Sequence, residues 1–128
     1  MAKVAVHSTH KYQQAIQARH HQLSADEGAG MGGDDQGPNP YELLLSGLGA
    51  CTSITLRMYA ERKGWTLGDI HVDLHFYRDE DGGEHIERTL YCSGDLAPEQ
   101  RERLLDIAGK TPVTRTVLQG TPVATQWK

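Results

Sequence analysis

The sequence YELLLSGLGACTSITLRMYAERK, residues 41–63, decides the fold of this chain. It contains no proline and no cluster of polar turn residues, and Gly64 is the first residue after it that could end a helix. Asn39 can cap the helix, and Pro40 suits the first helical position because its missing N–H would be unpaired there. The sequence therefore predicts one long helix over residues 41–63, with Pro40 at its start.

The middle of this predicted helix is apolar or small on nearly every side. Between Leu43 and Ala60, the only charged residue is Arg57. A helix of this kind is buried all round, either inside a domain or between two subunits. The chain has 128 residues, which predicts a single domain over residues 1–128. In so short a chain, a helix wrapped on every side indicates a dimer.

Strand patterns precede the helix. Residues 12–27 interleave polar and apolar side chains without a helical stripe, which predicts two short strands, and residues 4–7 predict a weaker one. Residues 28–40 hold five glycines and two prolines and are predicted to form a loop. The spacing of these glycines does not match a phosphate-binding loop.

A period of two follows the helix and predicts a hairpin. Residues 70–77 alternate apolar and polar side chains, RDEDGGEH turns the chain, and IERTLYCSG reads as the returning strand. In this strand, Cys92 shares a face with Leu90, Arg88 and Ile86.

Two short helices and an edge strand are expected at the end of the chain. Residues 97–109 have helix start and stop signals, and Thr111 can cap a second helix that opens at Pro112. Residues 121–128, TPVATQWK, are a candidate edge strand. The order of elements predicts an α+β fold in which an antiparallel sheet packs on the long helix and a C-terminal helix pair.

Composition excludes several classes of function. Thirteen Lys and Arg against seventeen Asp and Glu give a net charge of −4, so nothing points to nucleic acid or to an anionic membrane surface. No apolar run reaches the length of a membrane span, and the first residues lack the core of a secretory signal, so a cytoplasmic location is expected. His71 and His75 would lie roughly 13 Å apart along a strand. With no other suitable spacing, neither a metal nor a cofactor is expected.

Cys51 lies in the middle of the long helix, and the pattern leaves its role open. Glycine costs about 1 kcal/mol relative to alanine inside a helix, so Gly47 and Gly49 suggest that another backbone or a substrate comes close. Cys51 can be a small apolar residue where two helices cross, as buried cysteines often are. Alternatively, it is a thiol placed to react.

The segment GGDDQGPNPYELLLSGLGACTSITLRMYAERKGW, residues 32–65, closely resembles the central segment of the OsmC/Ohr family of osmotically inducible and organic hydroperoxide resistance proteins. The Asn39-Pro40 loop exit and Cys51 match its first-cysteine helix, and Pro112-Val113 and Arg115-Thr116 match its second half. The resemblance covers residues 18–125 and is nearest to the small OsmC-like redox proteins.

This resemblance implies an intertwined homodimer with the cysteine helices near the interface. It also implies thiol-dependent reduction of hydroperoxides as part of an oxidative stress response. In that chemistry a thiolate is oxidised to a sulfenic acid, which condenses with a second cysteine to form a disulfide. A dithiol reductant then restores the thiols.

The chain departs from the family pattern in two places. The family's second cysteine stands directly before the "PV" pair, where this chain has Thr111, which can cap a helix but cannot form a disulfide. The family's Glu, ten residues before the first cysteine, is Tyr41 here. Glu42 is next to it but is rotated by about 100° around the helix.

A thiol also needs a nearby cation or donor to react at neutral pH. Arg19 and Arg57 are the candidate cations, and a surface or packing role is equally open for each. Cys92 is expected to be a buried core thiol. The alternative, a Cys51–Cys92 disulfide, would need Cα atoms within about 7 Å.

The leading hypothesis is a cytoplasmic OsmC-like thiol peroxidase. Cys51 would be the peroxidatic thiol, Thr111 marks the lost resolving position, and an external thiol would resolve the sulfenic acid; Arg19 and Glu42 are further candidate site residues. The substrate would be a small hydroperoxide or a thiol. The alternative hypothesis is a dimer that binds a small ligand without turnover after losing the second cysteine.

Overall fold

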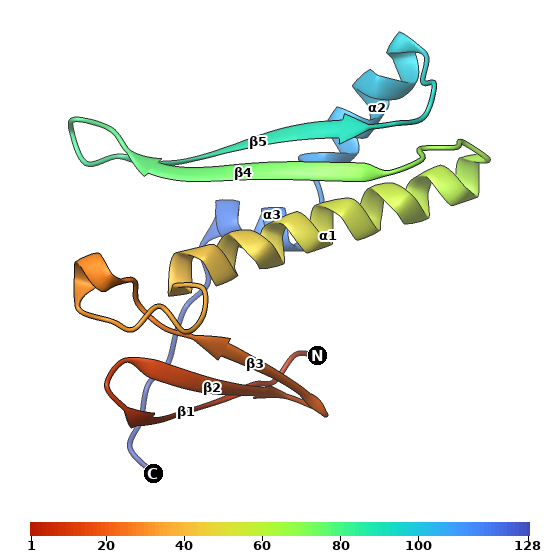
Figure 1. Cartoon of the computed structure of the whole chain (residues 1–128). Helices are drawn as coiled ribbons and strands as arrows, with labels where there is room; N and C mark the ends of the chain where they lie inside the picture. Colours follow the sequence, from red (N-terminus) through yellow and green to blue (C-terminus); the bar gives the residue numbers. More distant parts are fainter. The chain divides into compact units, whose positions relative to one another are not determined.

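The computed structural model describes all of residues 1–128 and has the predicted α+β architecture (Figure 1). The chain divides into two compact units, residues 1–46 and residues 47–128. Helix α1 (Pro40–Lys63) begins in the first unit and continues through the second. Each unit is described by itself.

The first unit is a three-stranded antiparallel meander. Strands β1 (Ala5–His10), β2 (Gln13–Ala18) and β3 (His21–Ala25) lie in that order. The two strands predicted over residues 12–27 are confirmed, and the first strand is longer than expected. The following loop contains a single 3₁₀ turn, η1 (Ala29–Met31). Buried Asp26 holds this loop because its carboxylate accepts the N–H groups of Glu27 and Gln36 at 2.8 and 3.1 Å.

Helix α1 begins with a capping box, as the Asn39-Pro40 pair predicted. The Asn39 Oδ1 atom accepts the Glu42 N–H at 2.8 Å, and Glu42 Oε1 accepts the Asn39 N–H at 2.8 Å. These two bonds satisfy donors that the first turn of a helix leaves free. The helix ends at Lys63, and Gly64 then adopts a φ of 71°, which suits glycine.

Within the single chain, α1 is buried along one stripe and not all round. The buried residues recur nearly every four positions, as one face of a helix requires: Leu48, Gly49, Thr52, Leu56 and Ala60. Ile54 and Met58 on another face are each 55% exposed. Burial on every side inside one domain is therefore wrong, whereas burial of the exposed face between two subunits stays a prediction.

By length and composition alone, α1 is apolar enough to cross a membrane, which the sequence analysis did not anticipate. The buried core helix of a folded domain passes the same test.

The second unit contains the predicted hairpin. Strands β4 (Ile70–Arg78) and β5 (Glu84–Cys92) pair in antiparallel register from Ile70 opposite Cys92 to Arg78 opposite Glu84. Alternate side chains are half-buried, so one face of the hairpin turns inward. Figure 1 shows this hairpin running alongside α1.

Gly49 marks a close approach of the hairpin to α1. A Cβ atom at this position would lie 2.8 Å from Leu74 Cδ1 of β4, which is closer than real contacts allow. The neighbour at Gly49 is a side chain and not the backbone that was expected, and a Cβ at Gly47 would meet open space, so the approach of another backbone to these two glycines is not found within the chain.

Helices α2 (Pro98–Ala108) and α3 (Pro112–Gln119) complete the second unit and confirm the predicted pair. Leu56 is fully buried at the centre of the core that α2 shares with α1 and the segments around the hairpin. The buried core residues are Leu56, Ala60, Leu67, Leu96, Leu104 and Ala108.

The edge strand expected over residues 121–128 is not formed. Val123 and Trp127, the large apolar residues of this segment, are 86% and 99% exposed. The prediction was wrong because these side chains find no surface in the chain to pack on and the backbone pairs with no strand.

Replacing Leu56 by alanine should lower the free energy of unfolding by about 2–5 kcal/mol, because the side chain is fully buried and leaves a cavity. Urea denaturation at fixed protein concentration measures this loss. Leu56→Met is the matched control and should cost under about 1.5 kcal/mol, because it conserves volume. Equal losses for the two variants would contradict this placement of the core.

Candidate functional site

Arg88 belongs to strand β5 in the second unit. Arg88 lies on the inward face of the hairpin, which is the face of β5 that also carries Ile86 and Leu90. Its Nη1 donates hydrogen bonds to Thr52 Oγ1 at 2.9 Å and to Thr114 Oγ1 at 2.8 Å, and its Nη2 donates to the Ala108 carbonyl at 2.8 Å. One guanidinium is thereby fixed to α1, α2 and α3 at once.

Three threonine hydroxyls support this cation. Thr52, Thr111 and Thr114 are all buried. Thr52 donates to the Leu48 carbonyl at 2.7 Å, so its oxygen is oriented to accept from Arg88. Thr111 and Thr114 share a hydrogen bond of 2.7 Å between their Oγ1 atoms.

Thr111 occupies the N-cap position of α3, but its side chain makes no capping hydrogen bond. The expected capping role is therefore wrong. The Thr111 hydroxyl is instead hydrogen-bonded to Thr114 Oγ1, the atom that accepts a hydrogen bond from the Arg88 guanidinium.

Cys51 precedes Thr52 on α1 and is a half-buried free thiol. Burial lowers the pKa of the Arg88 guanidinium from its ordinary value, and the negative charge of a Cys51 thiolate acts in the opposite direction. Arg88 forms no ion pair with a carboxylate, and all three of its acceptors are neutral oxygens. The guanidinium therefore keeps a net charge that a Cys51 thiolate can balance.

A mainly apolar cavity of about 240 Å³ opens beside Arg88. Arg88 and Thr114 supply its polar side chains. Such a cavity suits a small organic molecule with one polar group held at the guanidinium. Its lining comprises Leu48, Ile86, Arg88, Gly109, Thr114, Val117 and Leu118.

Arg19 and Glu42 belong to the first unit. Arg19 lies in the turn between β2 and β3 with a φ of 55°, and its carbonyl accepts a hydrogen bond from Gln17 Nε2. Glu42 closes the capping box of α1 with its carboxylate. The roles expected for both at Cys51 stay predictions.

Arg57 and Cys92 lie in the second unit, and their charges interact with each other. Burial raises the pKa of Cys92, whereas the charges of Arg57 and Arg101 act to lower it. Cys51 and Cys92 are both free, so the alternative Cys51–Cys92 disulfide is absent.

Arg88 is the residue that sequence reasoning missed. The signal for it was present, because Arg88 shares its face with Ile86, Leu90 and Cys92. An arginine on the apolar face of a strand has to be hydrogen-bonded if the face is buried. No group of three His, Cys, Asp or Glu side chains is placed to hold a metal ion.

Comparison with models of known protein families shows which family the chain belongs to. Residues 32–126, about three quarters of the chain, match the family model described as OsmC-like protein. The chain belongs to the OsmC-like family. The match includes both Cys51 and Thr111, so the residues joined around Arg88 lie inside the family domain. No curated protein matches the chain significantly.

Solved structures of OsmC-like proteins share the fold. An OsmC-like protein from Mycoplasma pneumoniae has a TM-score of 0.81 at 20% identity, covering 94% of this chain and 89% of the other. The organic hydroperoxide resistance protein OhrB of Bacillus subtilis has a TM-score of 0.64 at 23% identity, covering 94% and 92%. The organic hydroperoxide resistance protein OsmC from Legionella pneumophila has a TM-score of 0.67 at 18% identity, covering 91% and 88%. At these identities the similarity shows the fold.

Removing the charge of Arg88 should slow the reaction of Cys51 with iodoacetamide at neutral pH. In Arg88→Met the rate should fall by up to about fivefold, because the attraction between two partly exposed charges is worth at most about 1 kcal/mol. Arg88→Lys keeps the charge and should retain part of the rate.

Site-resolved mass spectrometry measures both cysteines in the same sample. Cys92 is the internal control, because the cations that act on it are Arg57 and Arg101. An equal change at Cys51 and Cys92 would mean that the substitution has loosened the fold and has not acted on the thiolate.

Proposed function

We propose that this OsmC-like protein reduces small organic hydroperoxides with Cys51 in a redox stress response, and that an external thiol completes the cycle. The observation that carries the proposal is the Arg88 guanidinium, which three neutral oxygens hold, one of them from Thr52, the neighbour of Cys51, and on which the charge of a Cys51 thiolate acts. Family membership supports it, as do structural relatives that are named organic hydroperoxide resistance proteins.

In the proposed first step, the Cys51 thiolate attacks one oxygen of the hydroperoxide. The S–O bond forms as the O–O bond breaks, so sulfur is oxidised to a sulfenic acid and the alkoxide leaves as an alcohol after taking up a proton from water. Arg88 contributes by stabilising the thiolate that starts the reaction.

The second step needs a thiol from outside the chain, because Thr111 stands at the position of the family's second cysteine. The external thiol attacks the sulfenic sulfur, which releases water and leaves a mixed disulfide on Cys51. A second equivalent of thiol then reduces this disulfide and restores Cys51.

The cavity beside Arg88 supports an organic hydroperoxide over hydrogen peroxide as the substrate. Leu48, Ile86, Val117 and Leu118 line it, so an apolar substituent of the substrate would be removed from water there. Arg88 and Thr114 supply the polar side chains of the cavity, and Cys51 lies three residues after the lining residue Leu48 on α1.

We propose that two copies of the chain form a homodimer, each contributing one OsmC-like domain of residues 1–128. Exposed apolar side chains on α1 and α3 support this, since Ile54 and Met58 are 55% exposed and Leu118 is 76% exposed in one chain. The family match spans both compact units, which supports one domain. Two free cysteines are consistent with a cytoplasmic location.

The alternative function is a dimer that binds a small ligand without turnover. The hydrogen bond between Thr111 and Thr114 favours it, because the former redox position now has a structural contact.

Hydroperoxide consumption by the purified protein with a dithiol reductant tests the function. We expect cumene hydroperoxide to be reduced faster than hydrogen peroxide, and Cys51→Ser to abolish the activity, whereas Cys92→Ser should retain it. Mass spectrometry after oxidant should find the sulfenic acid, trapped with dimedone, on Cys51. A wild-type protein whose Cys51 stays a free thiol would support the ligand-binding alternative.

Thr111→Cys should restore an internal disulfide with Cys51 after treatment with hydroperoxide, because Thr111 joins the Arg88 network through Thr114. Non-reducing peptide mapping identifies the bond. Thr116→Cys is the matched control, since Thr116 is an exposed residue of α3, where Thr111 is the N-cap residue, and its hydroxyl donates to the Pro112 carbonyl. If oxidant produced no bond to position 111, the site geometry would not support a two-cysteine cycle.

A further inference from the structure

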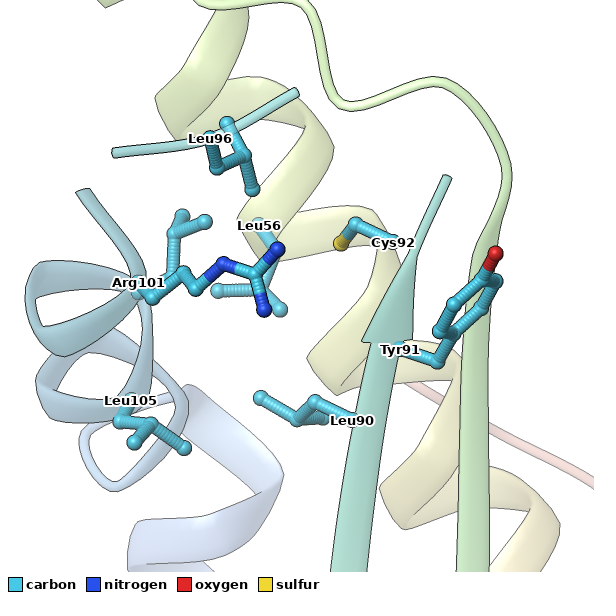
Figure 2. Close-up of a pocket in the computed structure, with 8 residues that line it drawn as sticks. Leu56, Leu90, Tyr91, Cys92, Leu96, Arg101 and Leu105 are labelled. Carbon is cyan, nitrogen blue, oxygen red and sulfur yellow. The ribbon is translucent and has the colours of Figure 1, made fainter. Parts of the chain in front are cut away.

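A second cavity of about 260 Å³ lies in the second unit, at the end of β5 (Figure 2). Its walls come from α1, β5, α2 and the segment that joins β5 to α2. Leu56, Leu96 and Leu104 are buried, so the inner wall is made of core residues. The cavity contains one thiol, that of Cys92, and one charged side chain, that of Arg101.

Figure 2 shows how these two groups face each other. The Arg101 guanidinium extends from α2 across the cavity, and the sulfur of Cys92 points toward it from β5. Leu90 and Leu105 lie to one side of the guanidinium and Leu96 to the other.

The charge of this cavity is uncompensated. Neither Arg101 nor Arg57 forms an ion pair, although both charges act on Cys92. The lining residues include no carboxylate. Burial raises the pKa of the Cys92 thiol, so at neutral pH the thiol stays protonated and does not neutralise the arginines.

An apolar cavity with an unpaired cation at its opening fits a particular kind of ligand. A ligand with an apolar body would displace water from the leucine side chains, and an anionic group on it would pair with the guanidinium. A cationic ligand would meet the Arg101 charge and no carboxylate in the lining. The volume lies just below the range of about 300–1,000 Å³ typical of sites for drug-sized ligands, so the ligand is small.

We propose that the Cys92 cavity is a binding site for a small organic anion with an apolar body, such as a medium-chain carboxylate, and that Arg101 pairs with its anionic group. The site is separate from that of Cys51. Ile86 and Arg88 line the first cavity, whereas Leu90 and Cys92 line the second, further along the same strand face. Arg88 and Cys92 are four residues apart, which is roughly 13 Å along a strand.

The test uses the full chain with Cys51→Ser, so that Cys92 is the sole thiol and reports on its own cavity. Octanoate is the probe, and octanol and octylamine, which share its chain length, are the neutral and cationic comparisons. The rate of Cys92 alkylation by N-ethylmaleimide is followed against amphiphile concentration, below micelle formation. We expect octanoate to protect Cys92 saturably, at concentrations at least tenfold lower than octylamine.

Arg101→Gln should weaken protection by octanoate at least tenfold and leave protection by octanol unchanged. Arg101 is exposed, so its replacement does not disturb the core. Arg62→Gln is the matched control, because Arg62 is an exposed arginine in the last turn of α1 outside the cavity. It should retain the octanoate affinity.

Three results would overturn the proposal. The first is equal protection by the three amphiphiles, which would show that charge plays no part. The second is an equal loss of affinity in Arg62→Gln and Arg101→Gln. The third is Cys92 protection that depends on protein concentration and not on octanoate, which would show that a second copy of the chain fills the cavity.

Discussion

The second unit depends on one half-buried cation that is hydrogen-bonded to all three helices. Arg88 leaves β5 and bonds Thr52 on α1, Thr114 on α3 and the last residue of α2. Moving a guanidinium out of water is costly unless hydrogen bonds replace its hydration, and here three oxygens do so. The same interaction that joins the elements therefore also holds an uncompensated positive charge near the Cys51 thiol.

The position of the family's second cysteine has acquired a different role in this arrangement. Thr111 is buried and bonds Thr114, which in turn accepts from Arg88. A side chain that cannot take part in disulfide chemistry thus holds one of the groups that orient the cation. What the structure shows at this position is a hydrogen bond in the network around Arg88.

Most elements of the fold could be predicted from local signals. The alternation of apolar and polar residues predicted the hairpin. Asn39 as a cap and Gly64 as a stop predicted the ends of α1, because these signals act within a few residues. Residues 121–128 could not be predicted in the same way, since an edge strand exists only if another strand pairs with it. The prediction that α1 is buried on every side within one domain failed for a related reason. The apolar faces of a helix do not specify whether the surface that covers them belongs to the same chain.

The candidate site was predictable where a motif carried it and not where tertiary packing created it. Cys51 and Thr111 followed from resemblance to a family segment. Arg88 did not, because its acceptors lie on three helices that are distant in sequence, and only the folded chain brings them together. A charged residue on a predicted inward face was the sign that such acceptors had to exist.

The contact at Gly49 links the packing of α1 to the strand that pairs with Arg88. Leu74 packs against this glycine and lies directly opposite Arg88 in the hairpin. A Cβ atom at position 49 would lie 2.8 Å from Cδ1 of Leu74, which is the end of a flexible side chain. A methyl group there would therefore be accommodated by a change in the Leu74 rotamer, and the backbones of helix and hairpin would keep their spacing.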